Sequence, residues 1–179
     1  MNDLVIRNAD VRDACAIATI QVRASLIAYK GIFSSSSPTL TIEGRRLVWR
    51  DIVATAHGQH CVLVAEQSDE ICGYAHFGPT RDAGEDPMST GELYSIYVAP
   101  ERWRQGIGGR LLVESMHTLG RGGFDTCTLW VQAPNDLAPR FYQRYGWWFD
   151  GAKKPADHEV LEVRYRTYGL APQASLRVP

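Results

Sequence analysis

Hydrophobic residues in the first third of the chain recur every three or four positions, a spacing that places them on one face of a helix. The first series follows Asp10, whose side chain can accept a hydrogen bond from an amide in the first turn of a helix. Its members are Val11, Ala14, Ala18, Val22 and Leu26. A second series predicts a helix from about Ile42 to Ala56, with Val48 and Ile52 on its apolar side.

Turn-forming residues separate these series from the rest of the chain. Gly31 and the run from Ser34 to Pro38 lie between the two predicted helices and predict a mobile loop. The stretch from Thr80 to Thr90 is rich in Gly, Pro, Asp and Glu, which predicts a second loop. No internal repeat is visible, and 179 residues suit a single hydrophobic core. We expect one domain over residues 1–170 and a disordered tail over residues 171–179.

Short runs of β-branched and aromatic residues predict the strands. Two of them, Cys61–Ala65 and Ile71–Phe77, are separated by Gln67, Ser68 and Asp69, a composition typical of a hairpin turn. The other predicted strands are Leu4–Arg7, Glu92–Val98, Thr126–Val131, Trp147–Phe149 and Glu159–Arg166, and two further helices are predicted at Gly108–Leu119 and Leu137–Tyr145. A doubly wound fold would need a helix inside the hairpin, where there is no room. The pattern therefore favours a mixed α/β class of the α+β type, with a largely antiparallel sheet.

A glycine turn joins the predicted strand Glu92–Val98 to the helix after it. It reads Arg-Gln-Gly-Ile-Gly-Gly over Arg104 to Gly109. Glycine lets a ligand approach the backbone closely, and the unpaired amides of a helix N-terminus attract anions, a pyrophosphate in particular. The dinucleotide fingerprint would need a third glycine where Leu111 stands, and the Gly-Lys-Ser/Thr of a P-loop is absent. The turn thus predicts another kind of phosphate site, or a strand–helix turn without a ligand.

Together with a second block, this turn resembles the core of the GNAT superfamily of acyl-CoA-dependent N-acyltransferases. The family signature Gln/Arg-x-x-Gly-x-Gly/Ala is matched from Trp103 to Gly108, with Trp103 where the family usually has Arg or Gln. The second block, Asn135 to Trp147, reads Asn-x-x-Ala-x-x-Phe-Tyr-x-x-x-Gly-Trp. The resemblance implies a sheet of about six or seven strands, about four flanking helices and a central strand–helix–strand acyl-CoA site. It extends from about Leu4 to Tyr168 and is specific only from Glu92 to Trp147.

The resemblance also implies catalytic roles, each of which has an ordinary structural alternative. Tyr142 would protonate the leaving thiolate, because a phenol with a pKa of about 10 keeps its proton at neutral pH; the alternative is a core tyrosine. Tyr145 is a weaker candidate. Glu92 would act as the base, directly or through water, since a free glutamate with a pKa of about 4.3 is a poor match for an amine near 10; the alternative is a surface carboxylate.

Acetyl-CoA is the acyl donor that the resemblance implies, as a substrate, and no metal is expected. The central strand would offer backbone groups to its pantetheine arm, and the glycine turn would hold its pyrophosphate. Asn135 would bind the pantetheine arm, cap a helix, or do both. The implied contact residues are Ile96, Tyr97, Val98, Arg104, Gln105, Gly106, Ile107, Gly108, Gly109, Arg110, Asn135 and Tyr142.

Composition narrows the classes of partner. A net charge of −1 gives no electrostatic reason to expect nucleic acid or an anionic membrane as a partner. The four cysteines form no Cys-x-x-Cys pair, so neither a disulfide framework nor a zinc site is expected. No long apolar run predicts a signal peptide or a membrane span, and the expected location is the cytoplasm. A homodimer is a further possibility that the resemblance implies.

The sequence thus predicts an N-acetyltransferase that moves the acetyl group of acetyl-CoA directly to a primary amine of a small molecule, such as an amino acid, a polyamine or an antibiotic-like amine. Two alternatives stay open: an acyl-CoA-binding regulatory domain without turnover, and an acetyltransferase of protein or peptide N-termini. The acceptor would be chosen by the first two helices and the two predicted loops. In the second loop, Asp82, Glu85 and Asp86 would either attract a cationic amine or be solvated.

Overall fold

The computed structural model describes residues 3–29, 41–135, 137–155 and 160–170. The predicted mobile loop around Ser34 to Pro38 and the predicted tail after residue 170 lie outside these ranges. The described strands are β1 (Val5–Asn8), β2 (Cys61–Gln67), β3 (Glu70–Pro79), β4 (Thr90–Val98), β5 (Thr126–Gln132), β6 (Trp148–Pro155) and β7 (Leu161–Tyr168). The helices are α1 (Ala14–Ala28), α2 (Ile42–Thr55), α3 (Ile107–Arg121) and α4 (Leu137–Gln143), with 3-10 turns η1 (Val11–Asp13) and η2 (Pro100–Arg102).

The strands form one seven-stranded sheet in the order β1-β2-β3-β4-β5-β7-β6. Neighbouring strands are antiparallel except β4 and β5, which are parallel. The prediction of a mixed, largely antiparallel sheet is confirmed. The hairpin between β2 and β3 is confirmed as well, because Ser68 and Asp69 have φ angles of 54° and 62°, as the two central residues of a type I′ turn require.

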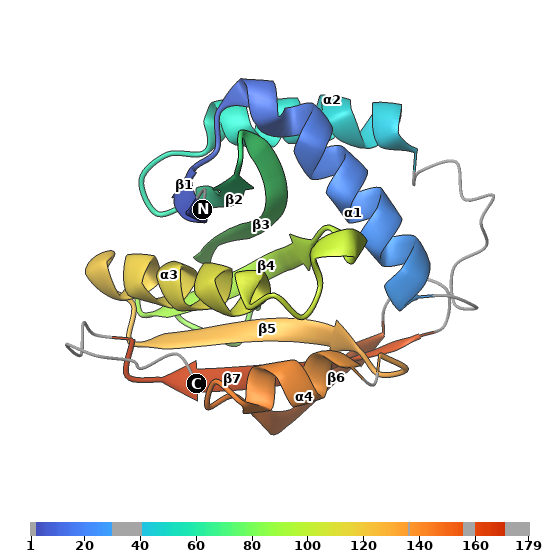
Figure 1. The fold of residues 1–179 in the computed structure, drawn as a ribbon. Coiled ribbons are helices and arrows are strands. Elements are labelled where there is room, and N and C mark those ends of the chain that lie inside the picture. Colours follow the sequence, from blue (N-terminus) through green and yellow to red (C-terminus); the bar gives the residue numbers. More distant parts are fainter. Residues whose placement is uncertain (1–2, 30–40, 136, 156–159, 171–179) are drawn as a thin grey trace.

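Helices cover both faces of the sheet, and strand alternation supplies each face with its own core (Figure 1). Val62 and Val64 of β2 belong to the core that includes residues of α1 and α2. Leu63 and Ala65, between and after them, belong to the core formed with α3 and α4. A period of two is what directs successive side chains to opposite faces. The sheet is therefore the middle layer of three.

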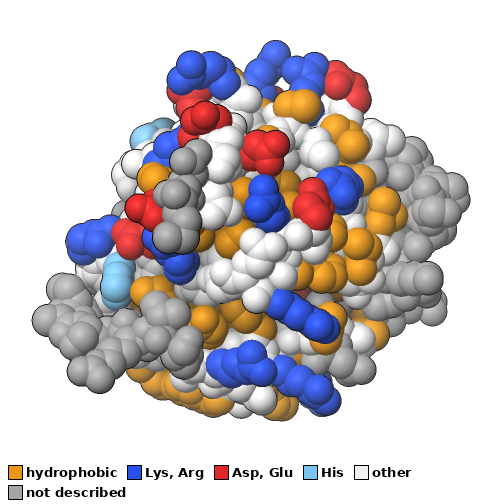
Figure 2. Space-filling view, viewed as in Figure 1, with side chains coloured by type: hydrophobic (Ala, Val, Ile, Leu, Met, Phe, Trp, Pro, Cys, Tyr) orange, Lys and Arg blue, Asp and Glu red, His pale blue; other side chains and the backbone are white. Residues whose placement is uncertain are grey.

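Acidic and basic side chains are interspersed over the upper part of the face seen in Figure 2, where α1 and α2 lie. Apolar side chains appear between them in scattered groups. This mixture fits the near-zero net charge of the chain, −1.

The predicted apolar faces of the first two helices are partly wrong. Val11 is 42% exposed and lies in the 3-10 turn at residues 11–13, before α1 begins. Leu26, near the end of α1, is 43% exposed, whereas Ala14, Ala18 and Val22 of the same series are buried. In α2, Val48 is also exposed, whereas Trp49 is buried and donates its indole N–H to Gln21 Oε1 of α1 at 2.8 Å. This anchor sets the face that α2 buries.

The predicted strand Trp147–Phe149 is too short. β6 continues to Pro155 as the edge strand of the sheet, beside β7. Its exposed and half-exposed residues alternate, and its register with β7 is irregular between Phe149 and Lys153. The sequence of β6 contains a glycine and two lysines and therefore lacks the apolar pattern of a buried strand. An edge strand can form without that pattern.

Replacement of Gly73 by Ala tests how closely α3 lies against the sheet. A Cβ atom at Gly73 would lie 2.9 Å from the Tyr97 carbonyl oxygen of β4 and 3.1 Å from Leu111 Cδ1 of α3. We expect Gly73→Ala to lower the free energy of unfolding by about 1–3 kcal/mol, measured by urea denaturation. Gly84→Ala is the matched control, because a Cβ there would meet nothing within 4 Å. Equal losses in the two variants would contradict this packing.

Candidate active site

The parallel strands β4 and β5 are paired over only three residues each. The partners are Thr90 with Thr126, Gly91 with Cys127 and Glu92 with Thr128. Beyond these positions the strands part. Residues 90–93 of β4 are buried, but each residue from 94 to 98 is partly exposed, although β4 lies in the middle of the sheet. A gap therefore opens within the sheet between the second halves of β4 and β5.

A bulge in β4 lies where the gap begins. His76 of β3 is opposite Ser95 and the next residue, Phe77, is opposite Leu93, so Tyr94 is an extra residue in β4. The Tyr94 ring lies on the face opposite α3, 4.7 Å from the His76 ring. Bulges bend a strand and are frequent next to active sites.

Backbone groups of β4 point into the gap. The amide of Ala99 donates to the Cys72 carbonyl on the β3 side at 2.8 Å. Because the direction of backbone polar groups alternates along a strand, those of Ile96 and Val98 point to the β5 side. The indole N–H of Trp103 donates to the Val98 carbonyl at 2.7 Å. The remaining N–H and C=O groups of Ile96 and Val98 line an edge to which an extended ligand can bind.

The N-terminus of α3 has the geometry of an anion site. Its N-cap is Gly106, which has a φ of 80° and gives no side-chain cap. Arg104 also has a positive φ, 63°. The first backbone bond of the helix runs from Arg110 N to Gly106 O, so the amides of the first three residues of the helix have no partner within it. Amides arranged in this way, together with the helix dipole, favour a phosphate group.

Some of the charged side chains around this turn are already paired with other residues, and others are exposed. Arg102 pairs with Glu70 at 3.4 Å, whereas Arg104 and Arg110 are exposed. A groove of about 500 Å³ beside the turn is lined in part by Arg102, Gln105 and Arg110. Trp103 does not supply the charge of the Arg that the family often has; it ties the turn to the end of β4. The groups that remain available to bind an anion at this turn are the main-chain amides and the neighbouring arginines.

Tyr142 lies on α4, in the core formed with α3. It is buried, at 8% exposure, and its ring lies 5.1 Å from that of Phe141 and 5.8 Å from that of Trp147. Burial raises the pKa of the phenol, and its neighbours Tyr97 and Cys127 raise it further. The phenol therefore keeps its proton at neutral pH, as a proton donor must.

Glu92 is not the surface carboxylate that was its structural alternative, since it is only 2% exposed. Its carboxylate accepts a bond from the backbone amide of Arg81 at 2.8 Å and pairs with the guanidinium of Arg81. The same guanidinium lies 4.1 Å from the centre of the Tyr94 ring. A carboxylate held in this way is already engaged by a cation.

Asn135 caps α4. Its Oδ1 accepts bonds from the amides of Leu137 and Ala138 at 3.2 and 3.1 Å. Its side chain also hydrogen-bonds with Tyr29, at the end of α1. Burial raises the pKa of Tyr29, as does the phenol of Tyr97, with which it also interacts. Tyr29 was not among the predicted residues, because a tyrosine at a helix end carries no signal that separates it from other tyrosines.

Two of the sequence candidates do not offer backbone groups to the open edge, although the phenol of Tyr97 interacts with Tyr142 and Tyr29. The backbone of Tyr97 faces β3, and its ring stacks on that of Tyr74 at 5.8 Å. The Tyr145 hydroxyl lies where a side chain at Gly109 would be, 1.9 Å from an added Cβ. Tyr145 therefore packs against α3, and Gly109 is needed for that contact.

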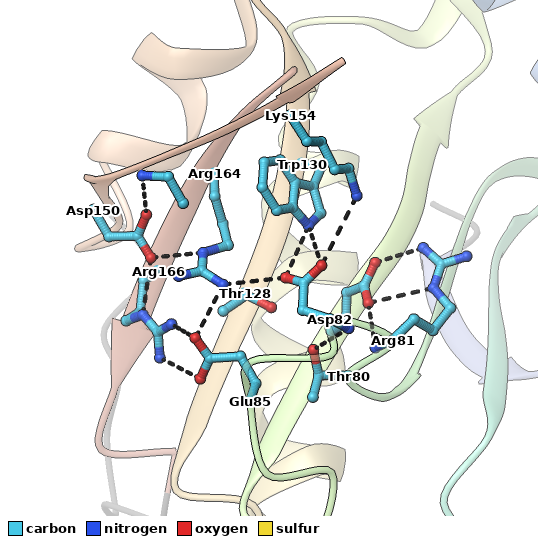
Figure 3. A network of polar contacts seen from close by, with 12 residues as sticks. Thr80, Arg81, Asp82, Glu85, Thr128, Trp130, Asp150, Lys154, Arg164 and Arg166 are labelled. Carbon is cyan, nitrogen blue, oxygen red and sulfur yellow. Dashed lines mark hydrogen bonds and ion pairs between the residues drawn. The ribbon is translucent and has the colours of Figure 1, made fainter. Parts of the chain in front are cut away.

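Two acidic residues of the loop between β3 and β4, Asp82 and Glu85, are paired with cations, whereas the third, Asp86, is exposed and accepts bonds from the Met88 amide and the Ser89 hydroxyl of its own loop. Asp82 accepts bonds from the Trp130 indole at 3.0 Å and from Arg164 at 3.2 Å (Figure 3). Glu85 pairs with Arg164 and Arg166. These contacts attach the loop to β5 and β7. The Asp82 and Glu85 carboxylates are thus paired with the protein's own cations.

Comparison with known proteins identifies the family. The model of the Acetyltransferase (GNAT) family matches residues 28–147. The chain belongs to the GNAT acetyltransferase family. YuaI of Bacillus subtilis, named an uncharacterized N-acetyltransferase, is 40% identical over 114 residues, which are 61% of this chain and 60% of YuaI. A mycothiol acetyltransferase of Acidimicrobium ferrooxidans is 33% identical over 104 residues, 58% of this chain and 31% of that protein. The chain thus spans less than two thirds of these relatives.

Solved GNAT structures share the fold. PaiA N-acetyltransferase of Thermoplasma acidophilum, in complex with coenzyme A, has a TM-score of 0.74 at 17% identity and covers 90% of this chain and 98% of its own. YncA of Salmonella typhimurium, with acetyl-CoA, has a TM-score of 0.71 at 22% identity, with 99% of both chains covered. In the described part of this GNAT chain, no group of three or more His, Cys, Asp and Glu is placed to hold a metal. No helix there has the length and apolar character needed to cross a bilayer.

His76 gives this site a pH dependence that stability measurements can detect. Burial, then the charges of Arg81 and His60, lower its pKa from 6.5 to about 4. The folded state therefore binds fewer protons than the unfolded state as pH falls from 6.5 toward 4. His76 should cost the folded state up to about 3 kcal/mol over that interval.

We expect His76→Phe, which keeps a ring beside Trp49 and Tyr94, to lose less stability than the wild type between pH 6.5 and pH 4. Urea denaturation at several pH values measures the difference. His57→Asn, at an exposed position, is the control and should follow the wild type. Parallel curves for His76→Phe and the wild type would contradict the assignment.

Proposed function

We propose that the chain is an acetyl-CoA-dependent N-acetyltransferase that moves the acetyl group directly to a primary amine of a small molecule. The observation that carries the proposal is the parting of β4 and β5, which leaves an open backbone edge on β4. Unpaired helix amides follow β4 in the chain, and Tyr142 has Tyr97 of β4 and Cys127 of β5 as electrostatic neighbours. The backbone edge suits an extended amide chain, the helix amides suit a pyrophosphate, and Tyr142 suits a leaving thiolate. Acetyl-CoA contains all three.

The glycine turn and β4 would bind the donor. The free amides at the start of α3 would donate hydrogen bonds to the pyrophosphate, with Arg104 and Arg110 close in sequence. The Ile96 and Val98 backbone groups would bond the pantetheine amides, and an N–H of this edge would polarise the thioester carbonyl. The side chain of Asn135 is engaged as a helix cap by its oxygen and also hydrogen-bonds with Tyr29, which leaves at most one of its two N–H groups as its contribution to ligand binding.

Tyr142 would stabilise and protonate the leaving thiolate. The raised pKa of its phenol keeps the proton in place until a strong acceptor forms beside it. Glu92 would act through a water relay, because its carboxylate is held by Arg81 and is nearly inaccessible. The acceptor amine would then reach the thioester from the face opposite Tyr142.

The acceptor class is supported by a relative. A protein with 33% identity is named mycothiol acetyltransferase, and a small-molecule acceptor is the interpretation that this name favours. A panel of small amines, amino acids, aminoglycosides and short peptides would test it, with release of free thiol from acetyl-CoA as the readout. Turnover on peptides alone would contradict the small-molecule acceptor, and failure to bind acetyl-CoA would contradict the whole proposal.

Tyr142→Phe tests the role of the phenol. Removal of a general acid should lower kcat by about 10²–10⁴-fold, while calorimetry should find acetyl-CoA binding unchanged. Tyr165→Phe is the matched control, since Tyr165 is buried in the same core with its ring 6.5 Å from that of Tyr142. An equal loss of kcat in both variants would assign the effect to packing.

A further inference from the structure

Lys154 reaches from the edge of the sheet toward the gap. It lies on β6, yet its ammonium nitrogen is 3.9 Å from the centre of the Trp130 ring on β5. Because β7 lies between β5 and β6, the side chain extends across a whole strand (Figure 3). Nζ also lies 3.7 Å from Glu162 Oε2 and 3.9 Å from Asp82 Oδ1, and the side chain remains 42% exposed.

Trp130 places this amine beside the gap. It follows Thr128, the last residue of β5 that pairs with β4, by two positions. Leu129 and Val131 belong to the same core as Tyr142, so alternation directs Trp130 to the opposite face. The amine of Lys154 and the phenol of Tyr142 therefore lie on opposite faces of the sheet, next to the same gap.

A second polar group of β5 is without a partner in this region. Gln132 Oε1 is buried and accepts no hydrogen bond in the described structure. Gln132 lies two residues beyond Trp130, so alternation directs it to the same face. A buried acceptor without a donor is costly and suits a site that receives an N–H group.

We propose that Lys154 is itself an acetyl acceptor, and that the chain acetylates this lysine from its own bound acetyl-CoA. The proposal rests on the proposed function, since the same donor is used. Lysine has a primary amine, the group that the site is proposed to acylate, on a flexible stem of four carbons that lets it swing from Trp130 into the gap.

The step is an ordinary transfer. The ammonium group first loses a proton to water, and the lone pair of Nζ attacks the carbonyl carbon of the thioester. A C–N bond forms, the C–S bond breaks, Nζ loses a second proton, and the thiolate takes up one proton. The products are a neutral amide at Lys154, free coenzyme A thiol and one released proton. The amide no longer carries the charge that holds Lys154 over Trp130.

Lys153 is a natural control within the same segment. Adjacent residues of a strand face opposite sides of the sheet, and the Lys153 ammonium lies 5.9 Å from the Phe149 ring. The chain has one other lysine, Lys30. Fragmentation of a single peptide by mass spectrometry distinguishes acetylation at Lys153 from that at Lys154.

The experiment incubates the full chain with acetyl-CoA and no added amine, and measures acetylation of each lysine over time. We expect Lys154 to be acetylated at least about tenfold faster than Lys153, because it is held near the donor. The rate should not depend on protein concentration. Tyr142→Phe should slow the reaction at Lys154 and leave the slow chemical reaction at Lys153 unchanged, and Lys154→Arg should remove the modification while Lys153→Arg should not.

Other outcomes overturn the proposal. Equal rates at Lys153 and Lys154, or no effect of Tyr142→Phe, would assign acetylation to acetyl-CoA in solution. A rate that rises with protein concentration would assign it to transfer between molecules. An unmodified Lys154 in a chain that releases thiol with free amines would overturn this inference and leave the proposed function intact. Absence of thiol release with every amine, and of acetyl-CoA binding, would overturn both.

Discussion

The parting of β4 and β5 is the constraint on which the rest of the structure depends. Because β4 and β5 pair at only three positions, the backbone groups beyond those positions lie in the centre of the sheet without a hydrogen-bonded partner strand. A buried backbone group without a partner costs about 1–3 kcal/mol. Residues 94–98 are partly exposed instead, so water can bind these groups, and a ligand with amides can replace that water. The open edge therefore costs little free energy, because its backbone groups are accessible to solvent.

The gap has to be held open by structures on either side of it. On the β4 side, β3 pairs along the strand through the bulge at Tyr94, and Trp103 ties the end of the strand to the glycine turn. On the β5 side, β7 pairs with the whole of β5. The loop before β4 is fixed by Asp82 and Glu85 to cations of β7. Each strand is thus restrained by its other neighbour, and neither can close on the other without loss of those contacts.

Local pattern was sufficient for the order of the elements and for the glycine turn, because both depend on contacts that are close in sequence. Five apolar residues at helical spacing in α3 are all buried: Ile107, Leu111, Leu112, Met116 and Leu119. The periodic pattern predicted the wrong helix face where contacts with other elements determine which face is buried. Trp49 of α2 is placed by Gln21 of another helix, and Val11 lies in a 3-10 turn before α1 begins. The fold class and the buried face of α3 could be predicted from local pattern, whereas the faces of α1 and α2 could be predicted only in part.

The candidate site shows the same division. The open edge at Ile96 and Val98 could be named from the resemblance, and Gly106 from its place between strand and helix. The partner of Glu92 could not, because Arg81 is eleven residues away in a loop that has no periodic pattern. Tyr29 and Trp130 were missed for a related reason, since they come to the gap from α1 and β5 through the fold alone.

The separation of charge and apolar groups between the two faces of the sheet bears on catalysis. The face with α3 and α4 carries a buried phenol among aromatic rings, where few charges compete for its proton. The opposite face beside the gap carries paired carboxylates and guanidinium groups, which would solvate a charged amine and the proton it releases in the proposed reaction. An acyl transfer needs a proton held on the thiolate side and a proton removed on the amine side. A sheet that opens between these two environments keeps the two proton transfers apart, and a closed sheet would leave no path between them.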